Sequence, residues 1–180
     1  MLFRSALTVL IVLTAQSVLA VSFAISGVPF TVTASRLDGQ GFEQFGVSDH
    51  SITSDLPGGG NRIVLASSAI RSATLSHMCL SVKLLGVTLR ITAADGGSPV
   101  NGTDLVIDAD RLSGNASFTH MSIGQDASTL RQVPGITGPV GGFSLASNTV
   151  AITNLRTHAF ATTAGSFTLP GLNLRFGRPC

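Results

Sequence analysis

The feature that most constrains this chain is its N-terminal segment, because no charged residue occurs between Arg4 and Arg36. The segment places Arg4 in front of the apolar run 6–13, which is typical of a secretory signal peptide. It then continues into residues 22–33, whose residue types are those of a strand. We therefore expect export from the cytoplasm, followed by a β-rich domain outside it.

Two interpretations of the first 20 residues stay open. Small residues stand where a signal peptidase requires them, and we favour a signal peptide, residues 1–20, cut after Ala20. Residues 21–180 would then form a single β-rich extracytoplasmic domain. The alternative is a retained membrane anchor helix, because the uncharged stretch exceeds the roughly 20 apolar residues that span a bilayer. Against the anchor, polar residues dilute the stretch, and Gly27 and Pro29 would end a helix early.

The low charge of the chain limits the kinds of partner that it can bind. Only 11% of the residues are charged, whereas an ordinary globular protein has about 25%. The arginines are scattered and the chain has neither Trp nor Tyr, so it lacks the basic clusters and aromatic platforms that bind nucleic acid. A surface with so few charges predicts exposed apolar patches, which usually mark contact with a lipid or a protein. We expect a membrane or lipid surface as the partner, or a co-encoded membrane protein.

The pattern beyond the signal segment predicts an all-β domain of antiparallel or stacked strands. No segment has the period of a long amphipathic helix, and Gly- and Pro-rich turns at 57–61, 95–99, 134–135, 138–139 and 170–171 separate the strand candidates. The candidates are residues 22–33, 63–66, 80–93, 105–109, 116–123, 149–152, 159–163 and 166–176. Whether they form a sandwich, a barrel or a solenoid stays open.

A weak internal repeat accompanies the strands. Residues 32–42 and 107–118 both read as an apolar residue, then Ala, then Arg-Leu, then Gly, with Phe soon after. Fainter copies at 70–75 and 152–156 give a spacing near 40 residues, centred on Leu37, Leu75, Leu112 and Leu155. Such a period is typical of supersecondary units that bury apolar faces on their neighbours.

The two cysteines, Cys79 and Cys180, predict one disulfide in an oxidising compartment. This bond would close a loop of about 100 residues, for which chain entropy gives about 4.7 kcal/mol. A zinc site with His77 and a reactive thiol are the alternatives. Zinc would need two further ligands, and none is adjacent in the sequence.

Several segments together resemble a known family. They are Phe23-Ala-Ile-Ser-Gly and the stretches 34–42, 103–110, 123–130 and 162–171, with the cysteines at 79 and 180. The resemblance is to an actinobacterial family of exported proteins without an established function, whose members are often labelled "cholesterol esterase". It covers most of residues 21–180 and implies no catalytic residue that could be carried over.

The esterase label can be tested against the sequence. The nearest approach to a Gly-x-Ser-x-Gly nucleophile elbow is 142–146, around Ser144, and it lacks the second glycine. His158 follows Ser144, but no acidic residue follows Asp126, so the order Ser, acid, His cannot be completed. An order of His, Asp and Ser can be assembled only by choosing among His50 or His77, Asp104 or Asp126, and Ser144 or Ser166.

We therefore expect a non-catalytic, exported cell-envelope protein that associates with membrane, lipid or a membrane partner. We expect no cofactor and no metal site, because Asp108 and Asp110, which alternation places on one strand face, lack the spacing of a calcium loop. The alternative function is a secreted lipid-ester hydrolase, similar to a cholesterol esterase, with Ser144 as the weak candidate nucleophile.

Overall fold

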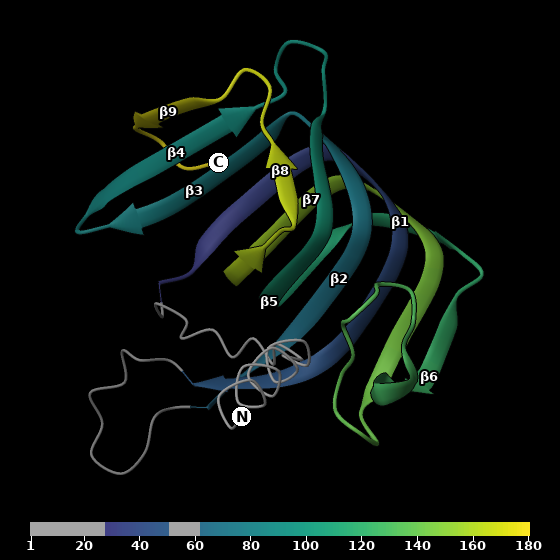
Figure 1. Ribbon diagram of the computed structural model, residues 1–180. Helices are drawn as coiled ribbons and strands as arrows, with labels where there is room; N and C mark the ends of the chain where they lie inside the picture. Colours follow the sequence, from purple (N-terminus) through teal and green to yellow (C-terminus); the bar gives the residue numbers. More distant parts are fainter. Residues whose placement is uncertain (1–27, 51–61) are drawn as a thin grey trace, which may run out of the picture.

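The computed structural model describes residues 28–50 and 62–180 (Figure 1). In that part of the chain it has nine strands, one 3₁₀ turn and no α-helix. The elements are β1 (Phe30–His50), β2 (Arg62–Ser76), β3 (Met78–Leu84), β4 (Val87–Ala93), β5 (Val100–Thr119), β6 (Ser122–Asp126), η1 (Ala127–Thr129), β7 (Phe143–Thr163), β8 (Ser166–Thr168) and β9 (Asn173–Phe176). The all-β prediction is confirmed.

The nine strands form one antiparallel sheet in the order β6-β7-β5-β2-β1-β3-β4-β9, with β8 paired to β5. Inside it the long strands pair in a circuit, because β7 also pairs with β1. The whole sheet is not closed into a barrel, since its two ends, β6 and β9, do not pair with each other in the described chain. Of the two predicted arrangements, antiparallel strands and stacked strands, the domain has the antiparallel one, in one strongly curved sheet (Figure 1).

The sequence pattern found most strands but placed several boundaries wrongly. The candidate 80–93 is two strands, β3 and β4, which turn at Leu85 and Gly86. Both turn residues have positive φ (49° and 88°), the geometry of a two-residue hairpin whose twist matches the strands. The candidate 166–176 is divided into β8 and β9 by the predicted turn at Pro170 and Gly171. The candidates 105–109 and 116–123 lie largely in one long strand, β5, and 149–152 and 159–163 both lie in β7.

The segments of the weak repeat lie within the long strands of this sheet. Residues 32–42 lie in β1 and 107–118 in β5. Leu37 and Leu75 stand directly opposite each other in neighbouring strands, and both are buried, as is Leu155. Leu112 is 39% exposed, so only three of the four repeated leucines belong to the core.

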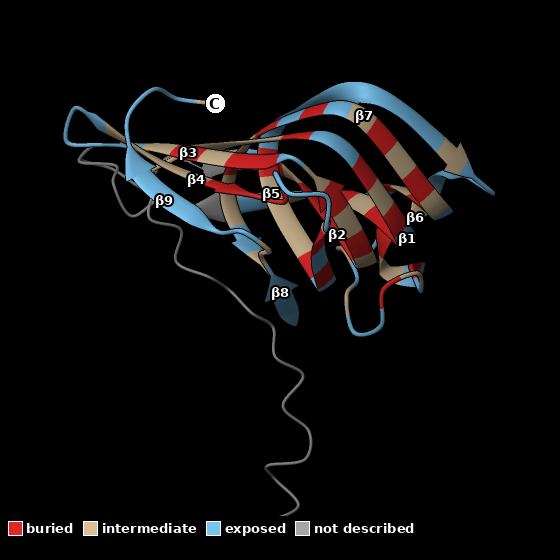
Figure 2. Cartoon of the chain, turned by 90° about the horizontal axis from the view of Figure 1, so that it is seen from above, coloured by how far each residue is buried: buried red, intermediate tan, exposed pale blue. Residues whose placement is uncertain are grey.

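Single residues within the long strands adopt positive φ: Gly41 in β1 (65°), Asp104 in β5 (48°) and Asn154 in β7 (54°). Such residues interrupt the strict alternation of a strand and let it change the face that it buries. Leu37 and Phe42 consequently belong to the same cluster although five positions separate them. Figure 2 shows how buried residues alternate with more exposed ones along β1, β2 and β7.

The apolar core consists of two clusters. The larger one is built by β1, β2, β5 and β7 together with Met78, Ala93 and Ala94. The smaller one contains Phe45 of β1, Ala146 of β7, and Ala127 and Leu130 of the segment that joins β6 to β7. The two clusters occupy opposite faces of the sheet because Phe42 and Phe45 lie an odd number of positions apart on β1.

Strands β3, β4 and β9 extend away from the curved part of the sheet (Figure 1), and we call these three strands the wing. The N-terminal segment 1–20, for which we predicted a signal peptide or anchor, and the predicted turn at 57–61 lie outside the described residues. Within residues 28–50 and 62–180, no helix is long and apolar enough to cross a bilayer.

Candidate functional site

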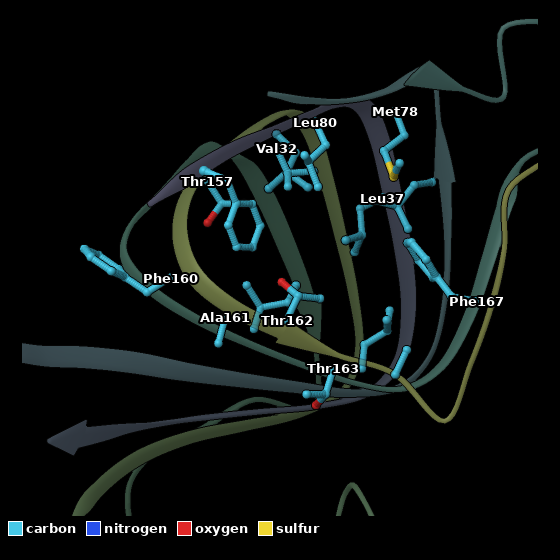
Figure 3. A pocket seen from close by; sticks show the side chains of 16 residues that line it. Val32, Leu37, Met78, Leu80, Thr157, Phe160, Ala161, Thr162, Thr163 and Phe167 are labelled. Atoms are coloured by element: carbon cyan, nitrogen blue, oxygen red, sulfur yellow. The ribbon is translucent and has the colours of Figure 1, made fainter. Parts of the chain in front are cut away.

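The most prominent hollow in the described chain is an apolar pocket of about 610 Å³ on the side of the larger core cluster (Figure 3). Its lining residues come from β1, β2, β3, β5, β7, β8 and the β7–β8 turn: Phe30, Val32, Leu37, Leu75, Met78, Leu80, Leu105, Ile107, Leu155, Thr157, Phe160, Ala161, Thr162, Thr163, Ala164 and Phe167. Small-molecule sites typically enclose about 300–1,000 Å³, so the pocket has the size of a ligand site.

Strand register places the lining side chains side by side. Val32 in β1 stands opposite Leu80 in β3 on one side and opposite Thr157 in β7 on the other. Phe30, two positions earlier, stands opposite Val82 and Ala159 in the same two strands. Residues that stand opposite each other in antiparallel strands share a face, so these positions form one continuous apolar surface. Figure 3 shows Val32 and Leu80 next to each other at one end of the pocket.

The polar groups of the pocket are few and none carries charge. Among its lining residues only Thr157, Thr162 and Thr163 have polar side chains. The Thr157 hydroxyl is buried and donates to the carbonyl oxygen of Arg111 at 3.0 Å, which satisfies it within the protein. Thr162 is exposed and Thr163 half-buried. The lining is therefore almost wholly apolar.

Ser144, the candidate nucleophile, lies outside this pocket. Its side chain is fully buried, and its hydroxyl donates to the carbonyl oxygen of Gln125 at 2.7 Å. A nucleophilic serine needs a neighbouring base to accept its proton and must be reached by the substrate. In the described chain the hydroxyl has a backbone partner instead, and no histidine is recorded as its partner.

Two of the histidines that the structure describes, His77 and His158, have other partners. Nδ1 of His158 lies 2.7 Å from Oδ1 of Asp110, and both side chains are 40% exposed. The Nδ1 atom of His77 lies 3.1 Å from the Ser35 hydroxyl, which also donates to the carbonyl oxygen of Ser76. Neither pair lines the pocket.

Glu43 is a buried acidic residue that the sequence patterns did not single out. Its side chain is inaccessible to solvent, and Oε2 accepts the backbone N–H groups of Gln132 (3.1 Å) and Val133 (3.4 Å). Oε1 has no hydrogen-bond partner. Burial raises the pKa of this carboxyl, although the two N–H groups and nearby Arg131 act in the opposite direction. Glu43 therefore ties the β6–β7 segment to β1, and its one sequence signal is a lone Glu between Phe42 and Phe45.

The acidic cap of this segment is Asp126. Its Oδ1 accepts from the backbone N–H and the hydroxyl of Ser128, each at 2.9 Å, while Oδ2 accepts from the N–H of Gly141 at 3.0 Å. These hydrogen bonds lower the pKa of Asp126. Asp126 stands opposite Phe143, one position from Ser144, but its carboxylate oxygens accept from Ser128 and Gly141. It is therefore a structural residue that closes the segment on itself.

Cys79 and Cys180 are joined by a disulfide across a sequence separation of 101 residues. The bond lies on the face of the wing opposite the Leu80 side chain, because Cys79 is one position from Leu80 on β3. The N–H of Cys180 donates to the Ser81 hydroxyl at 3.2 Å, which also holds the C-terminal residues against β3.

The fold and the pocket together define a class: an all-β protein whose curved sheet encloses an uncharged apolar cavity. The chain belongs to a family of unknown function, DUF6230, whose model matches residues 26–180. The match confirms one part of the resemblance, namely that the chain belongs to a family without an established function. No curated protein and no solved structure matches the chain.

Proposed function

We propose that this is an exported, non-catalytic protein of the cell envelope that holds a lipid acyl chain in the apolar pocket. The observation that carries the proposal is the lining of the pocket, where 16 residues contribute three hydroxyl groups and no charge. Such a lining favours an alkyl chain, because burial of apolar surface contributes about 25 cal/mol per Å² and no ionised group has to lose its water.

Export is supported by the sequence of residues 1–20 and by the disulfide, since disulfides persist mainly in oxidising compartments. Association with the envelope is supported by the low charge of the chain and by large apolar side chains at its surface, among them Leu85, Phe143 and Phe176. The origin in actinobacteria and the esterase label belong to the family resemblance and stay expectations.

The alternative function, a secreted lipid-ester hydrolase, would use the same pocket for the acyl chain of its substrate. It receives no support from Ser144, whose buried hydroxyl is bonded to a carbonyl oxygen outside the pocket. A binding protein needs only the pocket and is therefore the simpler interpretation of the geometry.

Binding of a fluorescent fatty acid, cis-parinaric acid, to the purified disulfide-bonded protein tests the proposal. Ala161 lines the pocket, so Ala161→Trp should fill part of it and weaken binding at least tenfold. The matched control is Ala116→Trp, because Ala116 is exposed on β5 and does not line the pocket. Equal binding by both variants, or no binding by the wild type, would refute the proposal.

Fractionation of the native host tests the location. We expect the protein in the envelope fraction, released by detergent and retained in high salt, because so few charges are available for an ionic attachment. Recovery chiefly in the culture supernatant as a monomer would contradict envelope association.

A further inference from the structure

The wing has one face made almost entirely of apolar side chains. Register places Leu80 opposite Ile91, Val82 opposite Leu89 and Leu84 opposite Val87. On the next strand, Leu174 stands opposite Ile91 and Phe176 opposite Leu89. Since opposed residues share a face, all these side chains lie on one side of the three strands.

This apolar face is poorly covered toward its outer end. Leu84, Val87, Leu174 and Phe176 are 39%, 53%, 59% and 67% exposed, and Leu85 at the tip of the β3–β4 hairpin is fully exposed. Exposed aliphatic and aromatic side chains that gather on one face of a sheet usually mark a contact surface.

The wing is also the most cationic part of the described chain. Residues 78–94 and 170–180 contain Lys83, Arg90, Arg175 and Arg178 and no acidic side chain. The ion pairs recorded among the described residues, Arg36–Asp38 and His158–Asp110, include none of the four. The remaining residues of the chain hold all nine acidic side chains.

Two of these cations stand directly opposite each other, since Arg90 in β4 pairs with Arg175 in β9. Like charges opposed across two strands destabilise a sheet unless something neutralises them. The Arg90 Nε donates to Cys79 Sγ at 3.2 Å, which does not neutralise its charge. This basic face is therefore complementary to an anion.

We propose that the wing is a docking surface for the anionic lipid bilayer of the cell envelope. An amphipathic helix that lies in the membrane interface buries its apolar face about 5–10 Å deep, with its cations among the headgroups. A single sheet layer meets the same requirement, because stacked sheets are only about 10 Å apart. The hairpin tip at Leu85 and the apolar face enter the lipid, and Lys83, Arg90 and Arg175 remain on the other face at the level of the phosphates.

The docking surface adjoins the pocket. Leu80 belongs to both the wing and the pocket lining, and it stands opposite Val32, another lining residue. A bilayer that covers the apolar face of the wing would therefore lie beside the pocket, and an acyl chain could pass between them without crossing water. The docking surface extends the proposed function by naming the surface that the protein binds. Only the passage of an acyl chain between bilayer and pocket rests on that function.

A bilayer suits the wing better than a second copy of the chain. Contact between two identical wings through their apolar faces would leave the opposed Arg90 and Arg175 of each wing on the outer faces, with no acidic side chain of the wing to neutralise them. An anionic bilayer satisfies the apolar and the basic face together.

Co-sedimentation with lipid vesicles tests the docking surface. The wild-type protein should bind vesicles of phosphatidylcholine and phosphatidylglycerol more tightly than vesicles of phosphatidylcholine alone. Each cation near an anionic surface contributes about 1 kcal/mol, so the double variant Lys83→Gln, Arg175→Gln should weaken binding to the anionic vesicles about 30-fold. Leu85→Glu should weaken binding to both kinds of vesicle at least tenfold.

The matched controls change exposed residues outside the wing. Arg111→Gln with Arg131→Gln removes the same charge from β5 and the β6–β7 segment, and Val140→Glu places an acid on an apolar loop residue that is 88% exposed. Both controls should bind vesicles like the wild type. Circular dichroism verifies that every variant retains its β structure.

Several outcomes would overturn the docking surface. They are no binding to either vesicle, equal loss of binding in the controls and the wing variants, or a dimer in light scattering that dissociates with Leu85→Glu and does not bind vesicles. Binding of cis-parinaric acid, measured in the same variants without vesicles, should be unchanged. Vesicle binding without fatty-acid binding refutes the pocket function alone, and the reverse refutes the docking surface alone.

Discussion

Cys79 is bonded to Cys180 at a point where Arg90 also reaches the Cys79 sulfur, so the last residues of the chain lie against the basic face of the wing. Strand β9 follows the long turn after β8 and pairs only with β4 among the described strands. With four residues it makes few ladder hydrogen bonds of its own. The disulfide is therefore the covalent link that holds the chain after β9 to β3 and so keeps β9 on the edge of the wing.

Replacing either cysteine should destabilise the protein. We expect Cys79→Ser and Cys180→Ser each to lower the free energy of unfolding by about 2–5 kcal/mol, because the unfolded chain loses its constraint. Denaturant unfolding of both variants measures the effect. Intact-mass spectrometry under alkylating, non-reducing conditions measures the bond itself, and uptake of two alkyl groups by the wild type would rule it out.

Ser144→Ala should not remove any acyl-ester hydrolysis that the purified protein shows. The change deletes the hydrogen bond to the Gln125 carbonyl, so we expect a loss of about 0.5–1.5 kcal/mol in stability. Assays with short- and long-chain acyl esters, with Ser166→Ala as an exposed serine control, measure activity. Hydrolysis that disappears only in a well-folded Ser144→Ala variant would establish the esterase.

Glu43 should make stability depend on pH. Because burial raises its pKa above the ordinary 4.5, the folded protein binds a proton more readily than the unfolded chain. The stability that Glu43 contributes is fully present below the unfolded pKa of 4.5 and is lost as pH rises through the raised pKa of the folded state. The free energy of unfolding should therefore fall as pH rises above 4.5. Glu43→Gln should remove this decrease. Identical slopes for wild type and variant in pH-dependent denaturation would contradict the prediction.

Glu43→Ala should lower the free energy of unfolding more than Glu43→Gln does. Alanine removes the acceptor of the Gln132 and Val133 N–H groups, and each buried donor left without a partner costs about 1–3 kcal/mol. Glutamine retains an acceptor oxygen at the same position. Urea unfolding near neutral pH compares the two variants, and equal stability would show that the β6–β7 segment does not depend on these bonds.

Gly39→Ala should destabilise the core by about 1–3 kcal/mol, since overpacking forces neighbouring side chains out of place. A Cβ atom at Gly39 would lie 2.8 Å from Cγ2 of Ile70 and 2.9 Å from Cγ1 of Val150. Gly46 on the same strand is the matched control, because a Cβ there would have no atom within 4 Å. Gly46→Ala should change stability by less than about 0.5 kcal/mol. Thermal unfolding that shows the same shift for both would disprove the close contact.

The sequence predicted the parts of the fold that depend on local pattern. Residue types, alternation and turn residues were enough for the all-β class and for the turn at Pro170 and Gly171. The hairpin at Leu85 and Gly86 was missed because Leu85 is an unusual residue at positive φ, and an apolar residue there masked the turn. The length of β5 and β7 was missed because the positive φ of Asp104 and Asn154 and the register shifts between Asp108 and Asn115 break the alternation on which strand boundaries are predicted.

By itself the sequence determined the strand-forming character of the chain, its low charge and the two cysteines that the structure joins, because these follow from residue type. Only the tertiary structure decided which strands become neighbours, since register depends on contacts between residues far apart in the sequence. That register placed Val32 between Leu80 and Thr157 and so created the pocket, and it placed Arg90 opposite Arg175 and so created the basic face of the wing. It also enclosed Ser144 and Glu43, because burial is a property of the folded sheet and not of either residue.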